Sequence, residues 1–355
     1  MRRRSRLDCG VTDSHPVPLS VLDLAPVVSG STAAEALRNT VDLAQHTERL
    51  GYHRFWLAEH HNMPGVASSS PAVLIGRVAD ATSRLRVGSG GVMLPNHPPL
   101  VVAEQFGMLE ALHPGRIDLG IGRALGTDQA TARALRRTTA PLSVDDFPQQ
   151  LAELLDYFNG SAAITAMPAP GYGPPLWLLG SSGYSAQVAG VLGLPFAFAH
   201  HFSPANTLPA LELYRSSFRP SGDLPQPYAM VAVSVIAADT DDDARRLAAP
   251  GGLAFLRLRS GRPGLFPSPE EAAAHPYTPM ERAAVDERFS SQVIGGPETV
   301  RAQLGELLAN TAGDELMITT MVHDHADRLR SYELVAEVLA TATGAFASAE
   351  LSPGA

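Results

Sequence analysis

Residues 55–65 have the sequence "FWLAEHHNMPG", which places one carboxylate and two imidazoles at the end of an apolar run. Neighbouring side chains of a strand point to opposite faces, so Glu59 and His61 are expected on one face and His60 on the other. A neutral imidazole can take up or return a proton near neutral pH. We interpret Glu59 and His60 as candidate catalytic residues. A histidine that merely caps the strand is the alternative that the residues leave open.

The stretch "WLLGSSGYSAQVAG", residues 177–190, has the form of a strand, a tight turn and the start of a helix. The free N–H groups at such a helix start, together with the helix dipole, favour an anion. Arg123, in "DLGIGRALG", supplies a further positive charge at another strand end. These features indicate a phosphate site, with an ordinary helix cap as the alternative. The turn residues concerned are Gly180, Ser181, Ser182, Gly183 and Tyr184.

Composition narrows the class of protein. The 355 residues are 45% hydrophobic and carry a formal net charge of -9, which argues against nucleic-acid binding. The sequence contains no lysine, and this excludes Schiff-base enzymes and Walker-type nucleotide sites. Cys9 is the single cysteine, and no run of about 18 apolar residues occurs. We expect a cytoplasmic protein that binds neither nucleic acid nor membrane.

Strand-like segments alternate with helical ones along the chain, and eight of them are apolar on both faces. This pattern predicts an α/β fold of one domain, a closed (β/α)8 TIM barrel. A Rossmann-like sheet is the runner-up, but its first turn offers only Gly30 for a phosphate. The expected strands cover residues 18–27, 53–60, 85–97, 116–123, 174–183, 194–202, 228–239 and 315–324.

The ends of the chain and one internal segment depart from this alternation. Residues 1–17 are expected to form an irregular tail, residues 18–345 the barrel, and residues 346–355 a second tail. Residues from about 250 to 292, between the seventh and eighth strands, are rich in proline, glycine and arginine. A connection of that length is typical of a lid, so we predict a lid insertion there.

Histidines also follow the later strands, as His200, His201, His323 and His325. Metal-dependent hydrolases on this fold carry a His-x-His pair on the first strand and often a modified lysine, and this sequence has neither. We therefore predict no metal centre. The segment "VHDHADR" is better explained as the start of a helix that Asp324 caps.

Four segments together resemble the bacterial luciferase-like flavin-dependent monooxygenases, from about Pro18 to about Val338. They are "WLAEHHNMPG", "GSGGVMLPNHPPLVVAEQFGMLEALHPGRIDLGIGRALGTDQ", "LWLLGSSGYSAQVAGVLGLPFAFAHHF" and "ELMITTMVHDHADRLRSYELVAE". The most similar branch contains single-chain oxygenases that tailor aromatic polyketides in antibiotic biosynthesis. The resemblance implies a TIM barrel that binds reduced FMN, a separate flavin reductase that supplies it, O2 as co-substrate and a homodimer.

The resemblance also implies roles for individual residues. His60 matches the family's catalytic histidine and Glu59 precedes it as in the family's motif. Gly90 and Gly91 match a pair, joined by a cis peptide bond, that lies against the flavin ring. The FMN phosphate would be bound by Arg123 and the turn from Gly180 to Tyr184. Gly122, also beside the flavin, stands where light-emitting luciferase has a reactive cysteine, so an oxygenase without light emission is expected.

The implied reaction proceeds through a flavin C4a-(hydro)peroxide, which inserts one oxygen atom by hydroxylation, epoxidation or Baeyer-Villiger chemistry. We expect a hydrophobic substrate, such as an aromatic polyketide. Two alternatives remain open: a deazaflavin-dependent oxidoreductase and a non-catalytic protein that holds flavin. The residues expected to line the substrate pocket are Leu24, Met93, Asn96, Phe198 and Thr320.

Overall fold

The computed structural model describes residues 17–124, 128–136, 146–222 and 224–349. Most of the expected N-terminal tail, including Cys9, lies outside these residues, as does the end of the C-terminal tail. None of the helices within the described ranges is long and apolar enough to cross a membrane.

Eight parallel strands form a closed barrel, as the sequence predicts. Each strand pairs with its neighbour in parallel register, and the last strand pairs with both the first and the seventh, which closes the ring. The strands are β1 (Leu19–Asp23), β2 (Arg54–Leu57), β3 (Arg86–Ser89), β5 (Ile117–Gly122), β6 (Leu176–Gly180), β7 (Phe196–Ala199), β8 (Ala229–Ala237) and β10 (Glu315–Thr319).

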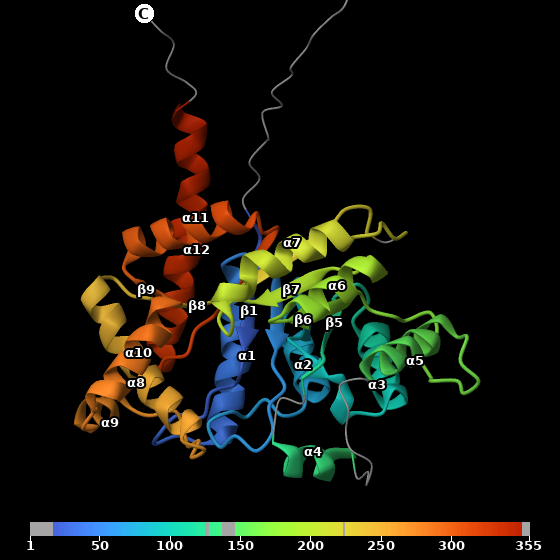
Figure 1. Ribbon diagram of the computed structural model, residues 1–355, viewed down its shortest axis with the longest axis horizontal. Helices are drawn as coiled ribbons and strands as arrows, with labels where there is room; N and C mark the ends of the chain where they lie inside the picture. Colours follow the sequence, from blue (N-terminus) through green and yellow to red (C-terminus); the bar gives the residue numbers. More distant parts are fainter. Residues whose placement is uncertain (1–16, 125–127, 137–145, 223, 350–355) are drawn as a thin grey trace, which may run out of the picture.

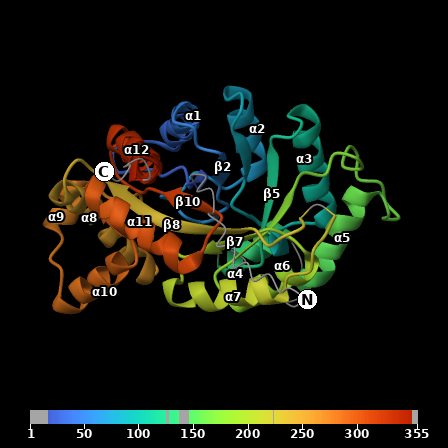
Figure 2. The same cartoon turned by 90° about the horizontal axis from the view of Figure 1, so that it is seen from above.

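Helices surround this barrel in Figures 1 and 2. Local signals set their starts: the Thr32 side chain accepts a hydrogen bond from the Glu35 N–H, and Pro71 occupies the first turn of its helix. The helices that follow the barrel strands are α1 (Ala33–Arg49), α2 (Pro71–Ala81), α3 (Pro99–Leu112), α4 (Gln129–Arg136), α5 (Phe147–Asn159), α6 (Gly183–Leu192), α7 (Thr207–Ser217), α8 (Asp241–Arg259), α11 (Pro297–Thr311) and α12 (His325–Ala349).

The expected lid between β8 and β10 is largely helical. Helix α8 continues through Pro250 to Arg259, and α9 (Pro269–Ala274) and α10 (Pro279–Ser290) follow it. Pro269 and Pro279, which suggested a loop, lie in the first turns of α9 and α10. The side chains of Ser268 and Thr278 cap these two helices. Helices α8, α9 and α10 gather at one side of the barrel in Figures 1 and 2.

Further differences concern short elements and the end of one long helix. Strand β4 (Val92–Met93) pairs with β5 and leads into the 3-10 turn η1 (Leu94–Asn96), and β9 (Val293–Gly295) extends the sheet beside β8. A second 3-10 turn, η3 (Pro204–Asn206), precedes α7. Helix α12 runs to Ala349, so residues 346–349, which were expected in a tail, are helical.

The strands are apolar on both faces because two separate layers of side chains pack against them. Phe55 and Leu57 belong to the large layer between strands and helices, whereas Trp56 and Ala58 belong to the small cluster inside the barrel. Trp56 and Trp177 meet edge to face there, with ring centroids 5.1 Å apart. The barrel is thus a packed core rather than a pore.

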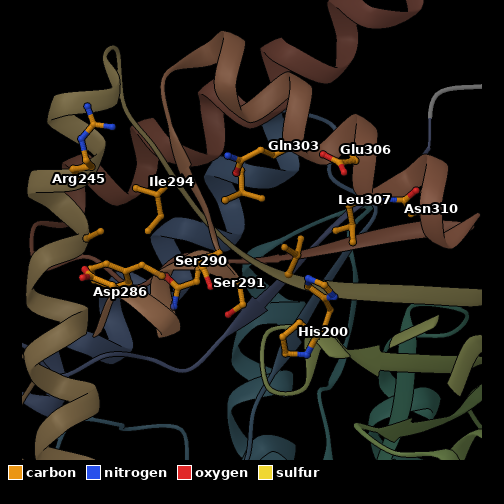
Figure 3. A pocket seen from close by; sticks show the side chains of 16 residues that line it. His200, Arg245, Asp286, Ser290, Ser291, Ile294, Gln303, Glu306, Leu307 and Asn310 are labelled. Carbon is orange, nitrogen blue, oxygen red and sulfur yellow. The ribbon is translucent and has the colours of Figure 1, made fainter. Parts of the chain in front are cut away.

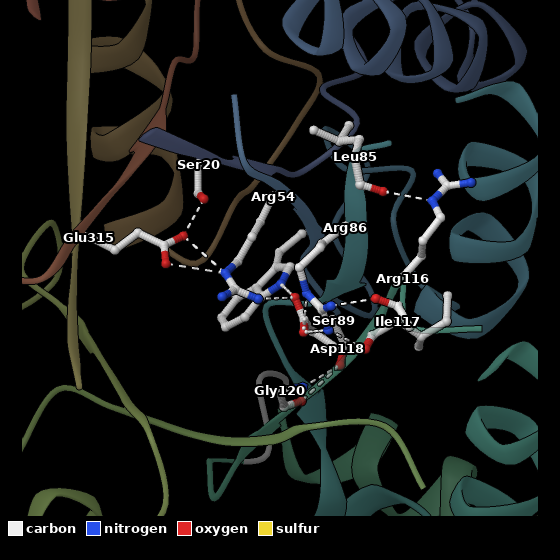
Figure 4. Close-up of polar contacts among 12 residues, drawn as sticks. Ser20, Arg54, Leu85, Arg86, Ser89, Arg116, Ile117, Asp118, Gly120 and Glu315 are labelled. Atoms are coloured by element: carbon white, nitrogen blue, oxygen red, sulfur yellow. Dashed lines mark hydrogen bonds and ion pairs between the residues drawn. The ribbon is translucent and has the colours of Figure 1, made fainter. Parts of the chain in front are cut away.

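A buried network of charges closes the N-terminal end of the barrel, as Figure 4 shows. The Asp118 carboxylate accepts hydrogen bonds from Arg54 Nη1 at 2.7 Å, from Arg86 Nε at 3.0 Å and from Trp56 Nε1 at 3.1 Å. The Glu315 carboxylate accepts from Arg54 Nε at 3.1 Å and from the Tyr228 hydroxyl at 2.8 Å. Both carboxylates are fully buried, so their ion pairs with Arg54 offset the cost of desolvation.

Candidate functional site at the C-terminal end of the barrel

Glu59 is fully buried just beyond β2 and joins two histidines. Its Oε1 atom lies 2.9 Å from His61 Nε2 and 2.8 Å from His97 Nε2, and its Oε2 atom accepts a hydrogen bond from the Met93 N–H at 3.0 Å. Glu59 and His61 therefore share one face, as the strand alternation predicts. His97, which follows η1, completes a cluster of one carboxylate and two imidazoles.

This cluster keeps Glu59 ionised. Burial alone would raise the pKa of Glu59, but the hydrogen bonds from His61 and His97 and the charge of His97 more than offset it and lower the pKa to about 2. The ligand atoms lie within 4.8 Å of one another, close enough to hold a metal ion. Hydrogen bonds within the cluster already account for this arrangement.

His60 follows Glu59 beyond the end of β2, and its charge acts on His201, which follows β7. The His60 N–H donates to the Ser68 carbonyl at 3.0 Å, which fixes the chain at this point. His201 is buried, and its Nδ1 atom lies 3.0 Å from the Ala232 carbonyl oxygen. Burial and the nearby charges of Arg288, His200 and His60 lower the pKa of His201 to about 4. His201 is therefore neutral at neutral pH, so it adds no positive charge beside His60.

Gly90 and Gly91 are joined by a non-proline cis peptide bond, as the resemblance implies. A Cβ atom at Gly90 would lie 2.6 Å from Leu22 Cδ1, and one at Gly91 would lie 2.8 Å from the Gly120 carbonyl oxygen. At Gly122 a Cβ atom would lie 2.9 Å from Met93 Sδ. Packing within the barrel is thus sufficient to require glycine at all three positions.

Arg123 and the start of α6 come together as the sequence predicts for an anion site. The Arg123 guanidinium lies over the Tyr184 ring, 4.0 Å from its centroid. Ser182 is the N-cap of α6, and its side chain makes no capping hydrogen bond. Ser181 and Ser182 are exposed, so their side chains are open to solvent beside the first turn of α6. An arginine, two hydroxyls and a helix N-terminus form a donor set that fits the phosphate of FMN.

The five expected lining residues have different surroundings. Leu24 packs against the cluster inside the barrel, and Met93 lies against Gly122. Phe198 is a correction: it belongs to the layer between strands and helices and contacts Phe196, because the small Ala197 takes the inward position. Thr320 is buried and donates a hydrogen bond to the Val235 carbonyl at 2.7 Å. Asn96 is buried in η1.

A cavity of about 930 Å³ lies elsewhere, between η3 and helices α8, α10 and α11. Figure 3 shows Arg245 at its left and His200 at its lower right, with Gln303 and Glu306 along its upper side. None of the residues predicted from the sequence to bind cofactor or substrate lines it. Val233, on the outward face of β8, forms part of its lining, so this cavity lies outside the barrel wall.

The later histidines hold separate partners. His200 Nδ1 lies 2.8 Å from the Thr207 hydroxyl, His323 Nε2 lies 3.0 Å from the Ser29 carbonyl oxygen, and His325 Nε2 lies 2.9 Å from the Asp42 carboxylate. Asp324 accepts from the Ala326 and Asp327 N–H groups, which confirms its predicted role as a helix cap. Because His323 and His325 each contact a protein group of their own, their i, i+2 spacing does not require a shared metal ion.

Two residues of this end have no predicted role. His97 ends the expected strand over residues 85–97, so the sequence places it at the barrel rim, but its contact with Glu59 was not predicted. The sequence does not place Arg288 there, since it lies on α10 in the segment expected to be irregular. Its Nη1 atom donates to the His201 carbonyl at 2.5 Å and so ties α10 to the end of β7.

Comparison with known proteins identifies the family to which this chain is related. Residues 17–315 match the luciferase-like monooxygenase family. The chain is 50% identical over 325 residues to a luciferase-like monooxygenase of Escherichia coli strain K12, covering 91% of this chain and 97% of that one. The crystal structure of apo-MsnO8 has 41% sequence identity and a TM-score of 0.84, covering 95% of this chain and 100% of that one.

A more distant structure has the same fold. The oxygenating constituent of 3,6-diketocamphane monooxygenase from Pseudomonas putida, in complex with FMN, has a TM-score of 0.67 and 19% identity, covering 92% of this chain and 99% of that one. The family match and the 50% identity are decisive: this chain belongs to the luciferase-like monooxygenases.

Proposed function

We propose that this protein is a monooxygenase that uses reduced FMN and O2 to insert one oxygen atom into an apolar organic substrate. Family membership supports this reaction class, and the FMN complex of a relative with the same fold supports the cofactor. The observation that carries the proposal within this chain is the contact between Arg123 and Tyr184 at the start of α6. It places a cation beside a free helix N-terminus at the same barrel end as His60.

Arg123 and α6 would bind the phosphate of FMN. The stacking contact holds the guanidinium plane but leaves its N–H groups available for an anion. The Ser181 and Ser182 hydroxyls and the first N–H groups of α6 add neutral donors. Reduced FMN, when bound, supplies the electrons that activate O2.

His60 would move the proton at the reacting edge of the cofactor. Its ring lies near the neutral His201, so no permanent charge at His201 opposes its protonation. Glu59 faces away from it and binds His61 and His97 instead. Within this proposal Glu59 is a positioning residue, which orders the Met93 backbone and the cluster behind His60.

The test of the cofactor is an anaerobic titration of the protein with chemically reduced FMN, followed by tryptophan fluorescence. We expect saturable binding that Arg123→Met weakens by about tenfold or more, because a charge-assisted contact is lost. Arg38→Met, on the exposed face of α1, is the matched control and should bind as the wild type does. Absence of binding by the wild-type protein, or tighter binding of reduced deazaflavin F420, would contradict the proposal.

The test of the proton role is the variant His60→Ala in a coupled assay with a flavin reductase, NADH and candidate substrates. We expect binding of reduced FMN to be retained while oxygenated product falls by about 10²-fold or more and hydrogen peroxide release rises. Product formation equal to that of the wild type would remove His60 from the proposed mechanism. Release of peroxide by the wild type with every substrate would instead support a flavin-holding protein without oxygenase activity.

The proposal also includes a flavin reductase and a second copy of this chain as partners. Among the described residues no second nucleotide site stands out beside the Arg123 turn, so a separate reductase would supply the reduced FMN. NADH oxidation by this protein alone, at a rate comparable to the coupled assay, would contradict that supply. The family resemblance also leads us to propose a homodimer, which sedimentation analysis at micromolar concentration would test.

A further inference from the structure

Arg288 is a half-buried cation beside the proposed reaction site, and its positive charge is poorly compensated. One of its five N–H groups donates to the His201 carbonyl, at 2.5 Å. Its guanidinium also lies 5.9 Å from the centre of the Phe255 ring. Burial lowers the pKa of Arg288, and no carboxylate of the described residues raises it or forms an ion pair with it.

Buried arginines elsewhere in the chain are compensated. Arg54 and Arg86 are paired with Asp118, and Arg328 is paired with Asp23. Arg116 has no carboxylate partner, but three carbonyls and the Thr82 hydroxyl accept its hydrogen bonds. A partly desolvated guanidinium is costly without such partners. Arg288 differs from these arginines because, within the part of the chain that the structure describes, its one hydrogen bond is to the His201 carbonyl.

The surroundings of Arg288 place it at the barrel mouth. It belongs to α10, and its contact with the His201 carbonyl brings it to the end of β7. His60 lies at the same end of the barrel, beyond the end of β2. A molecule bound across this end would therefore reach both side chains.

We propose that Arg288 binds an anionic group, a carboxylate or sulfonate, on the substrate, so that the preferred substrates are apolar compounds with one acidic end. This inference rests on the proposed monooxygenase function, and it adds the class of substrate. The planar guanidinium suits such a group because it can offer two parallel N–H donors. The apolar part of the substrate would extend from Arg288 toward His60.

The FMN phosphate is the other anion that Arg288 could bind, and the experiment separates the two. Affinities for octanoate and octanamide are measured by calorimetry with the wild-type protein, Arg288→Met and Arg282→Met. Arg282 is the matched control on α10, since it is exposed and lies over the Tyr277 ring. Affinities for reduced FMN and reduced riboflavin are measured for the same proteins under anaerobic conditions, and circular dichroism verifies folding.

We expect the wild type and Arg282→Met to bind octanoate about tenfold to a hundredfold more tightly than octanamide, and Arg288→Met to lose that preference while binding octanamide unchanged. All three proteins should bind reduced FMN alike. Equal binding of acid and amide by the wild type, or no binding of either, would overturn the proposal. So would a loss in Arg288→Met of affinity for reduced FMN but not for riboflavin, which would assign Arg288 to the phosphate. If the wild type prefers octanoate but binds no reduced FMN, the anion site stands and the monooxygenase function fails.

Discussion

The arginines beside the proposed reaction site differ from those at the opposite end of the barrel, although Arg328, also near the C-terminal end, is paired with Asp23. At the N-terminal end, Arg54 and Arg86 are held by the buried carboxylates of Asp118 and Glu315. At the C-terminal end, Arg123 lies on an aromatic ring and Arg288 on a backbone carbonyl, and within the described ranges neither forms an ion pair with a carboxylate. Arginines paired with carboxylates stabilise the strand ends, whereas arginines without a carboxylate partner are available to bind a ligand anion.

The carboxylates show the same division. Asp118 binds two arginines and an indole N–H, so it is fixed among permanent donors. Glu59 binds two imidazoles, those of His61 and His97. Asp118 is thus paired with guanidinium groups, while Glu59 is paired with imidazoles, the side chains most often used for proton transfer. This agrees with the general placement of function in TIM barrels at the end where strands run into loops.

The largest expected effect comes from breaking the N-terminal network. Asp118→Ala leaves Arg54, Arg86 and the Trp56 N–H without their shared acceptor, and should lower the free energy of unfolding by about 3–5 kcal/mol. Urea denaturation at pH 7 measures it. Asp242→Ala removes an ion pair whose side chains are 62% and 93% exposed, and should leave stability unchanged. A similar loss in both variants would contradict the contrast between buried and exposed pairs.

The second effect concerns Glu59 and depends on pH. The pKa of Glu59 is about 2 in the folded protein against an ordinary 4.5, so its contribution is complete above pH 4.5 and is lost as the pH falls toward 2. Glu59→Gln should cost roughly 3 kcal/mol at pH 7, with a smaller difference from the wild type at pH 4.

Urea titrations at several pH values measure that difference, and Glu212→Gln on the exposed face of α7 is the control. A cost that is the same at pH 7 and pH 4 would show that the charge of Glu59 contributes nothing to stability.

The smallest effect on stability is expected from the two arginines without a carboxylate partner, Arg123 and Arg288. Arg123→Met and Arg288→Met should each change the free energy of unfolding by about 1 kcal/mol or less, because cation–aromatic and single carbonyl contacts are weak. The same denaturation assay applies. A loss as large as that of Asp118→Ala would mean that these cations are structural, and the comparison of the two ends would fail.

Local sequence patterns predict the strand ends but not the network at the N-terminal end. The Glu59, His60 and Ser181 positions follow apolar strands and are found from the alternation alone. Arg54, Asp118 and Glu315 begin strands that lie 64 and 261 residues apart along the chain. They meet only when the register of the closed barrel is known, and no spacing in the sequence gives that register.

Two other differences between the prediction and the structure concern Phe198 and the prolines that begin α9 and α10. Phe198 was expected at the barrel mouth, yet Phe196 and Phe198 both belong to the layer between strands and helices. Ala197, between them, belongs to the cluster inside the barrel. Prolines 269 and 279 suggested a loop but occupy the first turns of α9 and α10, where their missing N–H groups cost nothing. Recognising Ser268 and Thr278 as caps would have predicted both helices and, with α10, the position of Arg288.

The anion site at the start of α6 is central to the proposed function. A crystal structure of the protein with FMN is the most direct measurement. We predict the phosphate at the N-terminus of α6, within hydrogen-bond distance of Arg123 and of the Ser181 or Ser182 hydroxyl, with the flavin ring extending toward His60. Phosphate density in the cavity beside His200 and Arg245, or a ring directed away from His60, would contradict it.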